Sequence, residues 1–359
     1  MTILHFAISL LPVVFFLSIL ILIDSYKLVR PRWVVFALLA GAGAAGLSYV
    51  TNTWILSFEV DTQIFHRYLA PSVEEFYKAA FVAYLVAANR VGFTVDAAIQ
   101  GFAVGAGFAV IENIYYLTEL GDASSRVWMI RGLGTAIMHG GSMAVFAILA
   151  KTFSDRKNHS KITPYLLAYV AAFVLHSSFN HFILPAEIIT VVQLLVFSLI
   201  ITVLFQESEK LTRSWLGTGF DTDQELLRTI ISGEVSRTHV GEYLSMLKRN
   251  FDGPIVVDML CLVRIRVELS VRAKGILMMR KAGFKVAPDP DTRYKFAEMK
   301  YLEQSIGRVG LIAIEPIHQW TRRDLWQLNV IDTSGSGANS GVRKSRLSQA
   351  SQSDETASS

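Results

Sequence analysis

The chain has 359 residues, of which 52% are hydrophobic and 18% charged, and its formal net charge is +4. The hydrophobic residues are gathered into long blocks, which excludes an ordinary soluble domain, and the small basic excess requires no nucleic-acid partner. A single cysteine, Cys261, excludes an intrachain disulfide and a cysteine-pair zinc site.

Stretches of roughly 20 apolar residues, the length that crosses a bilayer core, recur through the first 205 residues. They predict an all-α fold, a polytopic transmembrane helix bundle of about seven spans. The first stretch has no basic segment before it and no small-residue cleavage site after it, so we expect a span and not a signal peptide. The predicted spans cover residues 4–23, 33–56, 71–88, 95–118, 128–152, 164–184 and 186–205.

The distribution of lysine and arginine between the short loops predicts the orientation of the bundle. Basic residues follow the first, third and fifth spans, whereas the alternate loops carry acidic residues and isolated arginines. We therefore expect a multi-pass protein of the cell membrane with its amino terminus outside and its carboxyl terminus in the cytoplasm. The inner-face residues are Lys27, Arg30, Arg32, Arg90, Lys151, Arg156, Lys157 and Lys161.

The composition changes twice after the last span, which predicts a transmembrane bundle over 1–205, a cytosolic domain over 206–330 and a disordered tail over 331–359. The middle part has mixed charge with apolar residues at helical spacing, for example in 241–250 and 263–274, so it should be a small, mainly helical domain. The last part is rich in Ser, Gly, Asn and Thr, as disordered segments are.

Several ionisable residues interrupt the apolar spans. Because a charge at membrane depth costs free energy, such residues usually line a site or a water-filled cavity. At about 1.5 Å of rise per residue, the glutamates and histidines of four spans fall at neighbouring depths below the outer surface, which predicts one shared site. Arg131 is close enough to the end of its span to extend to the interface. The groups at this depth are Glu75, Glu112, His139 and His176, and Glu74 and Lys78 lie beside Glu75 on the same span.

Helical spacing orients these groups. Lys78 lies three residues after Glu75 and four after Glu74, so it can neutralise one carboxylate while the other stays free. His176 and Asn180 are four residues apart, which would aim two donors at a point where an oxyanion forms, unless they make an interhelical hydrogen bond instead.

Glycines indicate where helices approach closely. Gly101 and Gly105 are spaced for close helix contact, which predicts a central fourth span, so that Glu112 must find a partner in Lys78, His139 or a bound metal. Gly140 and Gly141 leave room beside His139 for another backbone or a substrate.

Buried carboxylates and imidazoles without a serine nucleophile motif favour hydrolysis by activated water over covalent catalysis. In one version a glutamate takes a proton from the water. In the other, side chains from the set Glu75, Glu112, His139 and His176 hold a divalent metal such as zinc, which lowers the pKa of the water. The sequence has no His-Glu-x-x-His segment, so the metal version lacks its usual signature.

Four motifs in spans three to six resemble those of the PrsW family of intramembrane proteases, within the CAAX prenyl endopeptidase-like and Abi superfamily. In place of the histidine of the wider superfamily, the second motif has a glutamate in Phe108-x-x-x-Glu112, which favours the PrsW branch. The motifs are Pro71-Ser-Val-Glu-Glu-Phe-Tyr-Lys78, Gly105-Ala-Gly-Phe-Ala-Val-Ile-Glu-Asn113, His139-Gly-Gly-Ser and His176-Ser-Ser-Phe-Asn180.

This resemblance implies an endopeptidase that cuts a single-span membrane protein, such as an anti-sigma factor, near its extracytoplasmic end. Alternatives are a non-catalytic scaffold subunit of the same superfamily and an ion- or proton-coupled transporter. The complete polar set argues against the scaffold, and the lack of detectable inverted repeats argues against the transporter. The implied active-site residues are Glu74, Glu75, Glu112, His139 and His176, with Lys78, Asn113 and Asn180 in supporting places.

Overall fold

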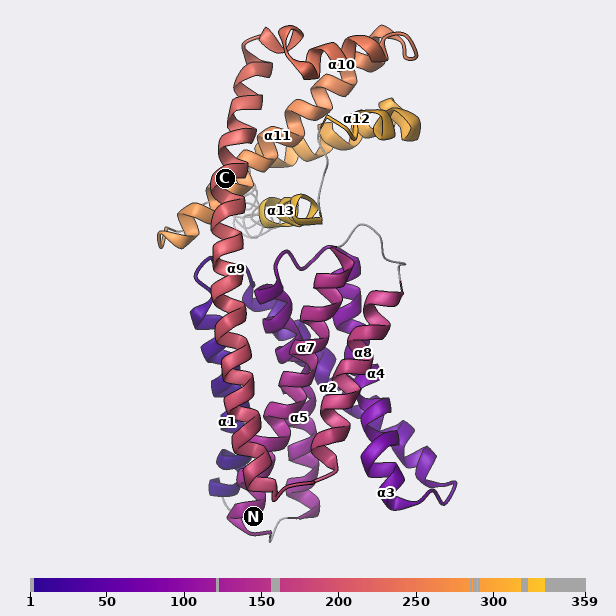
Figure 1. Cartoon of the computed structure of the whole chain (residues 1–359), viewed down its shortest axis with the longest axis vertical. Helices are drawn as coiled ribbons and strands as arrows, with labels where there is room; N and C mark the ends of the chain where they lie inside the picture. Colours follow the sequence, from indigo (N-terminus) through magenta and orange to yellow (C-terminus); the bar gives the residue numbers. More distant parts are fainter. Residues whose placement is uncertain are drawn as a thin grey trace, which may run out of the picture. The chain divides into compact units, whose positions relative to one another are not determined.

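The computed structural model describes residues 3–120, 123–155, 162–284, 286, 289, 291–317 and 322–332. Every regular element in these ranges is a helix (Figure 1), which confirms the predicted all-α fold. The chain divides into two compact units, Met1–Thr212 and Arg213–Ser359, and each is described by itself. The tail predicted to be disordered lies outside the described residues from residue 333 onward, as do Arg156, Lys157 and Lys161.

The first unit follows the predicted spans closely. Prolines in the first turn begin three of its long helices, where the missing N–H has no intrahelical partner to lose. Its elements are α1 (Ile3–Ile23), α2 (Pro31–Leu56), α3 (Thr62–Ile64), the π-helix η1 (Phe65–Leu69), α4 (Ala70–Ala87), α5 (Thr94–Glu119), α6 (Ser125–Met129), the π-helix η2 (Ile130–Thr135), α7 (Ala136–Ser154), α8 (Thr163–Asn180) and the beginning of α9 (Ala186–Ile231).

Five helical segments among the described residues are long and apolar enough to cross a membrane: α1, α2, α5, the continuous segment from α6 to α7, and α9. The remaining long helices, α4 and α8, have 18 residues each and carry many of the polar residues predicted for the site. Both pack against α7. The chain is therefore a multi-pass membrane protein.

Helix α5 is central to the first unit, because it packs against α1, α2, α4 and α7. A Cβ atom on Gly105 would lie 2.0 Å from the carbonyl oxygen of His139, and one on Gly101 would lie 2.3 Å from that of Met143. The close helix contact predicted from these glycines is confirmed. It brings the backbone of α5 directly against the backbone of α7 at His139.

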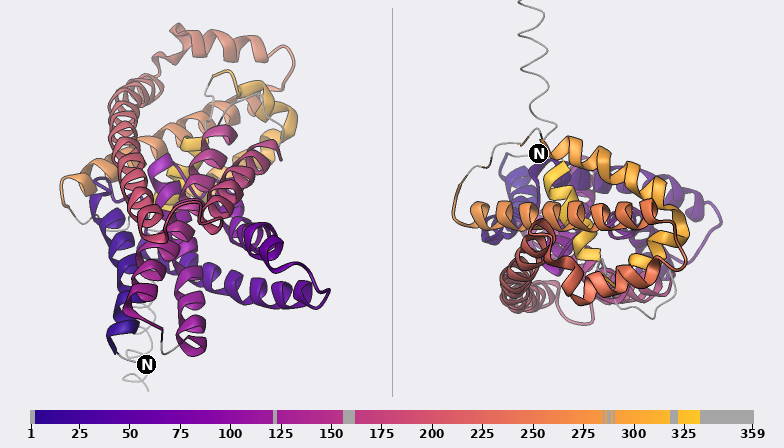
Figure 2. Two further views of the ribbon diagram at one scale, coloured as in Figure 1. Left: turned by 60° about the horizontal axis from the view of Figure 1, so that its bottom comes forward. Right: turned by 90° about the horizontal axis from the view of Figure 1, so that it is seen from above.

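Two π-helical turns interrupt the bundle, one before α4 and one between α6 and α7. Such turns occur frequently at functional sites. The η2 turn packs against α1 at Gly132, where a Cβ atom would lie 2.1 Å from the carbonyl oxygen of Ile8. The connection from α2 to α4, which includes α3 and η1, projects from the side of the unit (Figures 1 and 2).

The second unit contains the end of α9, the short 3-10 helix η3 (Glu234–Arg237), and α10 (His239–Leu247), α11 (Gly253–Lys281), α12 (Asp291–Ile314) and α13 (Arg322–Asp332). Helix α11 packs against α12 and α13 (Figure 2). The helices expected in 241–250 and 263–274 are confirmed by α10 and α11. Cys261 is half-buried against the apolar core of this unit.

A buried polar cluster ties three helices of the second unit together. Lys274 of α11 donates to Asp223 of α9 over 2.7 Å, and Ser270 donates to the same carboxylate oxygen. Gln327 of α13 donates to the Ser270 hydroxyl over 2.9 Å. A buried ion pair of this kind needs further hydrogen bonds to offset the loss of hydration, and Ser270 supplies one.

Replacing Gly105 with alanine should destabilise the first unit, because the added methyl group overlaps the His139 carbonyl. Overpacking costs about 1–3 kcal/mol, so we expect a lower midpoint of thermal unfolding in detergent. Gly43→Ala in α2 is the matched control, since nothing lies within 4 Å of a Cβ there. Equal unfolding midpoints for the two variants would contradict this packing.

Candidate active site

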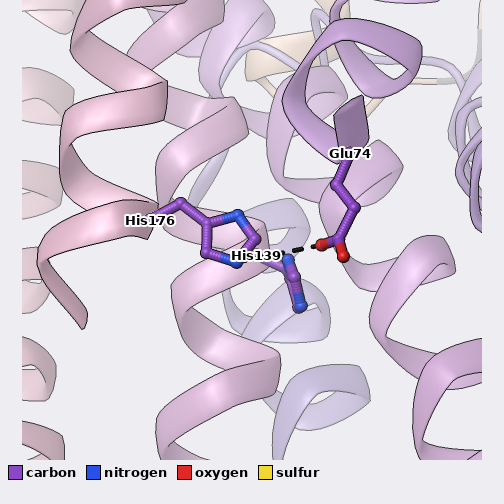
Figure 3. Close-up of side chains that lie close together, drawn as sticks. All are labelled: Glu74, His139 and His176. Carbon is purple, nitrogen blue, oxygen red and sulfur yellow. Dashed lines mark ion pairs between the residues drawn. The ribbon is translucent and has the colours of Figure 1, made fainter. Parts of the chain in front are cut away.

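The glutamates and histidines predicted for one site do meet inside the first unit. Helix α4 supplies Glu74, Glu75 and Lys78, α5 supplies Glu112, α7 supplies His139 and α8 supplies His176. Glu74, His139 and His176 point toward one another (Figure 3). The groups lie toward the start of α4 and the ends of α5 and α8, which is one end of the bundle because neighbouring helices run in opposite directions.

Glu75 is the most highly bonded carboxylate of the site and is fully buried. One of its oxygens accepts a hydrogen bond from the Lys78 ammonium, and the same oxygen lies 2.7 Å from Nδ1 of His176. The Ser142 hydroxyl lies 3.3 Å from both carboxylate oxygens. Because its oxygens already accept these hydrogen bonds, Glu75 serves to fix the orientation of neighbouring side chains, above all the imidazole of His176.

Glu74 has a different environment, although it is the neighbouring residue. Its Oε2 is buried and has no hydrogen-bond partner among the described residues, and its Oε1 lies 3.5 Å from the amide nitrogen of Asn52. Oε2 is 3.8 Å from Nε2 of His176, which is too long for a hydrogen bond. The carboxylate that Lys78 leaves unpaired is therefore Glu74, and it faces an imidazole nitrogen across a short gap.

His139 is fully buried and bonded on both sides of its ring. Its Nδ1 lies 3.0 Å from Nζ of Lys78, and its Nε2 lies 3.0 Å from Oε2 of Glu112. An ammonium group can only donate, so Nδ1 accepts from Lys78 and Nε2 donates to Glu112. The ring stands perpendicular to that of His176, with 4.8 Å between the ring centroids.

Arg131 lies in this site, and the expectation that it extends to the interface is wrong. Its Nη2 is 3.3 Å from Oε2 of Glu112, and its Nε donates to Oδ1 of Asn113 over 3.0 Å. The reason is the η2 turn, which holds residue 131 beside α5. Ser142 also lies in the site and was not predicted there, although it forms part of the His139-Gly-Gly-Ser motif.

The two asparagines in supporting places hold the surrounding helices. Asn113 donates to the backbone carbonyl of Ser9 in α1 over 2.8 Å. Asn180 donates to the carbonyl of His66 in η1 over 3.0 Å. His176 and Asn180 therefore do not point at a common position. The imidazole of His176 is hydrogen-bonded to Glu75, and the side-chain amide of Asn180 donates to the His66 carbonyl. Asn180 makes the interhelical hydrogen bond that was the alternative.

The space predicted beside His139 is filled by another backbone, one of the two predicted occupants, and by aromatic rings. A Cβ atom on Gly105 of α5 would lie 2.7 Å from the Cα atom of Gly140. A Cβ atom on Gly140 would lie 2.5 Å from the ring of Phe102, and one on Gly141 would lie 2.2 Å from the ring of Phe197. These glycines serve helix packing and leave no room there for a substrate. An apolar groove of about 410 Å³ runs between α7, α8 and α9, but none of the ionisable site residues lines it.

Three side chains of the site could hold a metal ion. Glu74, His139 and His176 each offer one ligand atom, and these atoms lie within 4.8 Å of one another (Figure 3). The Oε2 atom of Glu74, which has no hydrogen-bond partner among the described residues, fits such a role. Glu75 bonds Nδ1 of His176 and leaves Nε2 facing Glu74, and carboxylates commonly orient metal-binding histidines in this way. For His139 to bind a metal, it must first release Lys78 or Glu112.

Residues 30–205 match the sequence profile of the PrsW family intramembrane metalloproteases. This segment belongs to the PrsW family. The matched residues include every side chain of the site just described, so this PrsW segment is an intramembrane protease. No curated protein and no solved structure gives a significant match.

The two adjacent glutamates of the PrsW segment should differ in their effect on stability. Glu75→Gln leaves the buried Lys78 ammonium without its counter-charge, and removing one partner of a buried ion pair costs about 3–5 kcal/mol. Glu74→Gln removes a carboxylate that no cation pairs with, so the unfolding midpoint should change little. Thermal unfolding in detergent measures both. If Glu75→Gln were as stable as Glu74→Gln, this division of roles would be wrong.

Proposed function

We propose that the protein is an endopeptidase that hydrolyses a peptide bond of a membrane-anchored protein near its extracytoplasmic side. The observation that carries this proposal is the buried gap between Oε2 of Glu74 and Nε2 of His176, two groups able to bind a cation or a water molecule. Glu112 and Arg131 border it and are the more exposed members of the site, with 22% and 14% of their side chains accessible.

The donor set suits zinc, which prefers imidazole and carboxylate ligands and in proteases keeps one position open. We propose that Glu74, His139 and His176 hold it. When bound, the ion would lower the pKa of a water molecule and polarise a carbonyl group. The remaining residues of the chain then have separate tasks, which follow from their contacts.

Glu75 accepts the Nδ1 proton of His176 and keeps Nε2 available as a lone pair toward Glu74. Lys78 neutralises Glu75, so that the interior of the site carries less net charge. Glu112 is the accessible carboxylate. It can take a proton from the attacking water and pass it to the leaving amine, as a general base and then a general acid.

The side of the membrane follows from the loops. Lys27 and Arg30 lie between α1 and α2, Arg90 lies between α4 and α5, and Lys151 lies in the last turn of α7, all at the end of the bundle away from the site. By the positive-inside rule, these residues support a cytoplasmic location for that end. The proposed cut therefore falls close to the outer leaflet. A single-span protein such as an anti-sigma factor is the substrate class we propose.

Cleavage is tested with purified protein in detergent and a library of single-span fusion proteins whose new termini are identified by mass spectrometry. We expect cuts near the extracytoplasmic end of the span and a loss on the order of 10²-fold or more in rate for Glu74→Gln. Full activity of Glu74→Gln would overturn the mechanism. A wild-type protein that cuts no fusion would favour a scaffold or a transporter.

The metal is tested by elemental analysis of purified protein. We expect about one zinc per chain, and loss of both zinc and activity after dialysis against a chelator. His176→Gln should lose the zinc, whereas Asn180→Ala, one turn along the same helix, should keep it because Asn180 bonds the His66 carbonyl instead. Activity that survives complete metal removal would contradict the zinc version and favour water activation by a glutamate alone.

A further inference from the structure

We propose that Arg131 binds the carbonyl oxygen of the scissile peptide and stabilises the oxyanion that forms there. This inference rests on the proposed function. It replaces the pair of His176 and Asn180, which the sequence predicted for that task and which the structure separates.

Arg131 is held rigidly by the residues around it. Asn113 accepts its Nε hydrogen, and that amide is in turn fixed by its bond to the Ser9 carbonyl. The guanidinium carbon lies 3.7 Å from the centre of the Tyr116 ring, and a cation stacked on an aromatic face is stabilised by the ring electrons. A donor fixed in this way needs little reorganisation when charge develops beside it.

The guanidinium still has hydrogen-bonding capacity to spare. Its Nη2 is buried and makes no hydrogen bond among the described residues, although it lies 3.3 Å from Oε2 of Glu112. Buried donors without partners are uncommon in native proteins, and each calls for an explanation such as a ligand. A substrate carbonyl is an acceptor of the right kind, because guanidinium groups only donate.

Exposure separates Arg131 from the other cation of the site. Lys78 is fully buried, donates to Glu75 and His139, and lies over the ring of Phe108. Arg131 retains 14% of its side-chain surface, beside Glu112 with 22%. Of the two cations, Arg131 is therefore the one whose side chain keeps accessible surface and whose Nη2 has no hydrogen-bond partner among the described residues.

The chemistry of peptide hydrolysis requires such a donor. Attack of water on the carbonyl carbon forms the C–O bond while the carbonyl π electrons move to oxygen, and collapse of this tetrahedral species expels the amine, which takes the proton held by Glu112. Removing one oxyanion donor typically lowers kcat on the order of 10² to 10³-fold. Because the charge exists mainly in the transition state, KM should change little.

The test compares Arg131→Met and Arg131→Lys with wild type on the fusion protein that wild type cuts fastest. We expect kcat to fall on the order of 10² to 10³-fold for Arg131→Met, less for Arg131→Lys, and KM to stay within about threefold. Arg126→Gln is the control, because Arg126 is largely exposed and pairs with Glu187 away from the site. Unfolding midpoints establish that each variant is folded, and Arg131→Lys keeps the charge if Arg131→Met unfolds.

A second measurement separates oxyanion binding from a merely structural role. A phosphonamidate analogue of the cleaved peptide carries a tetrahedral anionic oxygen, so its affinity should fall with Arg131→Met by the same factor as kcat/KM. Binding of the uncut fusion protein, measured in the Glu74→Gln background, should not change. An unchanged kcat, or equal losses for analogue and substrate, would overturn the proposal. A wild-type protein that cuts no fusion protein, in contrast, would defeat the proposed function itself.

Discussion

The active site depends on one buried carboxylate, that of Glu75. An ammonium, an imidazole and a hydroxyl from three helices converge on it, which links α4 to α7 and α8 at the depth where the chemistry takes place. An isolated charge in this interior would be prohibitively costly, and the ion pair with Lys78 makes its burial tolerable. Glu74 can then keep an oxygen without a hydrogen-bond partner, because the contacts of Glu75 hold the surrounding helices in place.

Backbone packing supplies the second constraint. Gly101 and Gly105 let α5 touch the main chain of α7, so that Glu112 near the end of α5 comes within hydrogen-bond distance of His139. Inside a bilayer, apolar side chains gain little free energy by exchanging contacts with lipid for contacts with another helix. Small residues and interhelical hydrogen bonds therefore provide much of the helix association. The same contacts that stabilise this bundle therefore set the geometry of its site.

The sequence was sufficient for the helices and for the residues that converge. Runs of apolar residues and the depth of Glu75, Glu112, His139 and His176 depend on spacing along single helices, which a sequence displays directly. It was insufficient for Arg131 and Asn180, because both positions depend on π turns. Arg131 lies in the η2 turn beside the site, and Asn180 donates to the His66 carbonyl in the η1 turn. Gly140 and Gly141 predicted room for another backbone or a substrate, and the structure places the backbone of α5 and the rings of Phe102 and Phe197 there.

The pairing of Glu75 with Lys78 on a single helix also bears on how the protein is made. Ser142 and His176 belong to helices that leave the ribosome after α4 does, so neither is present when α4 first meets the membrane. Lys78, three residues away on the same helix, is synthesised with Glu75 and can cancel its charge at once. Helix α4 thus enters the membrane with the counter-ion of Glu75 already on it, before α5, α7 and α8 have been synthesised.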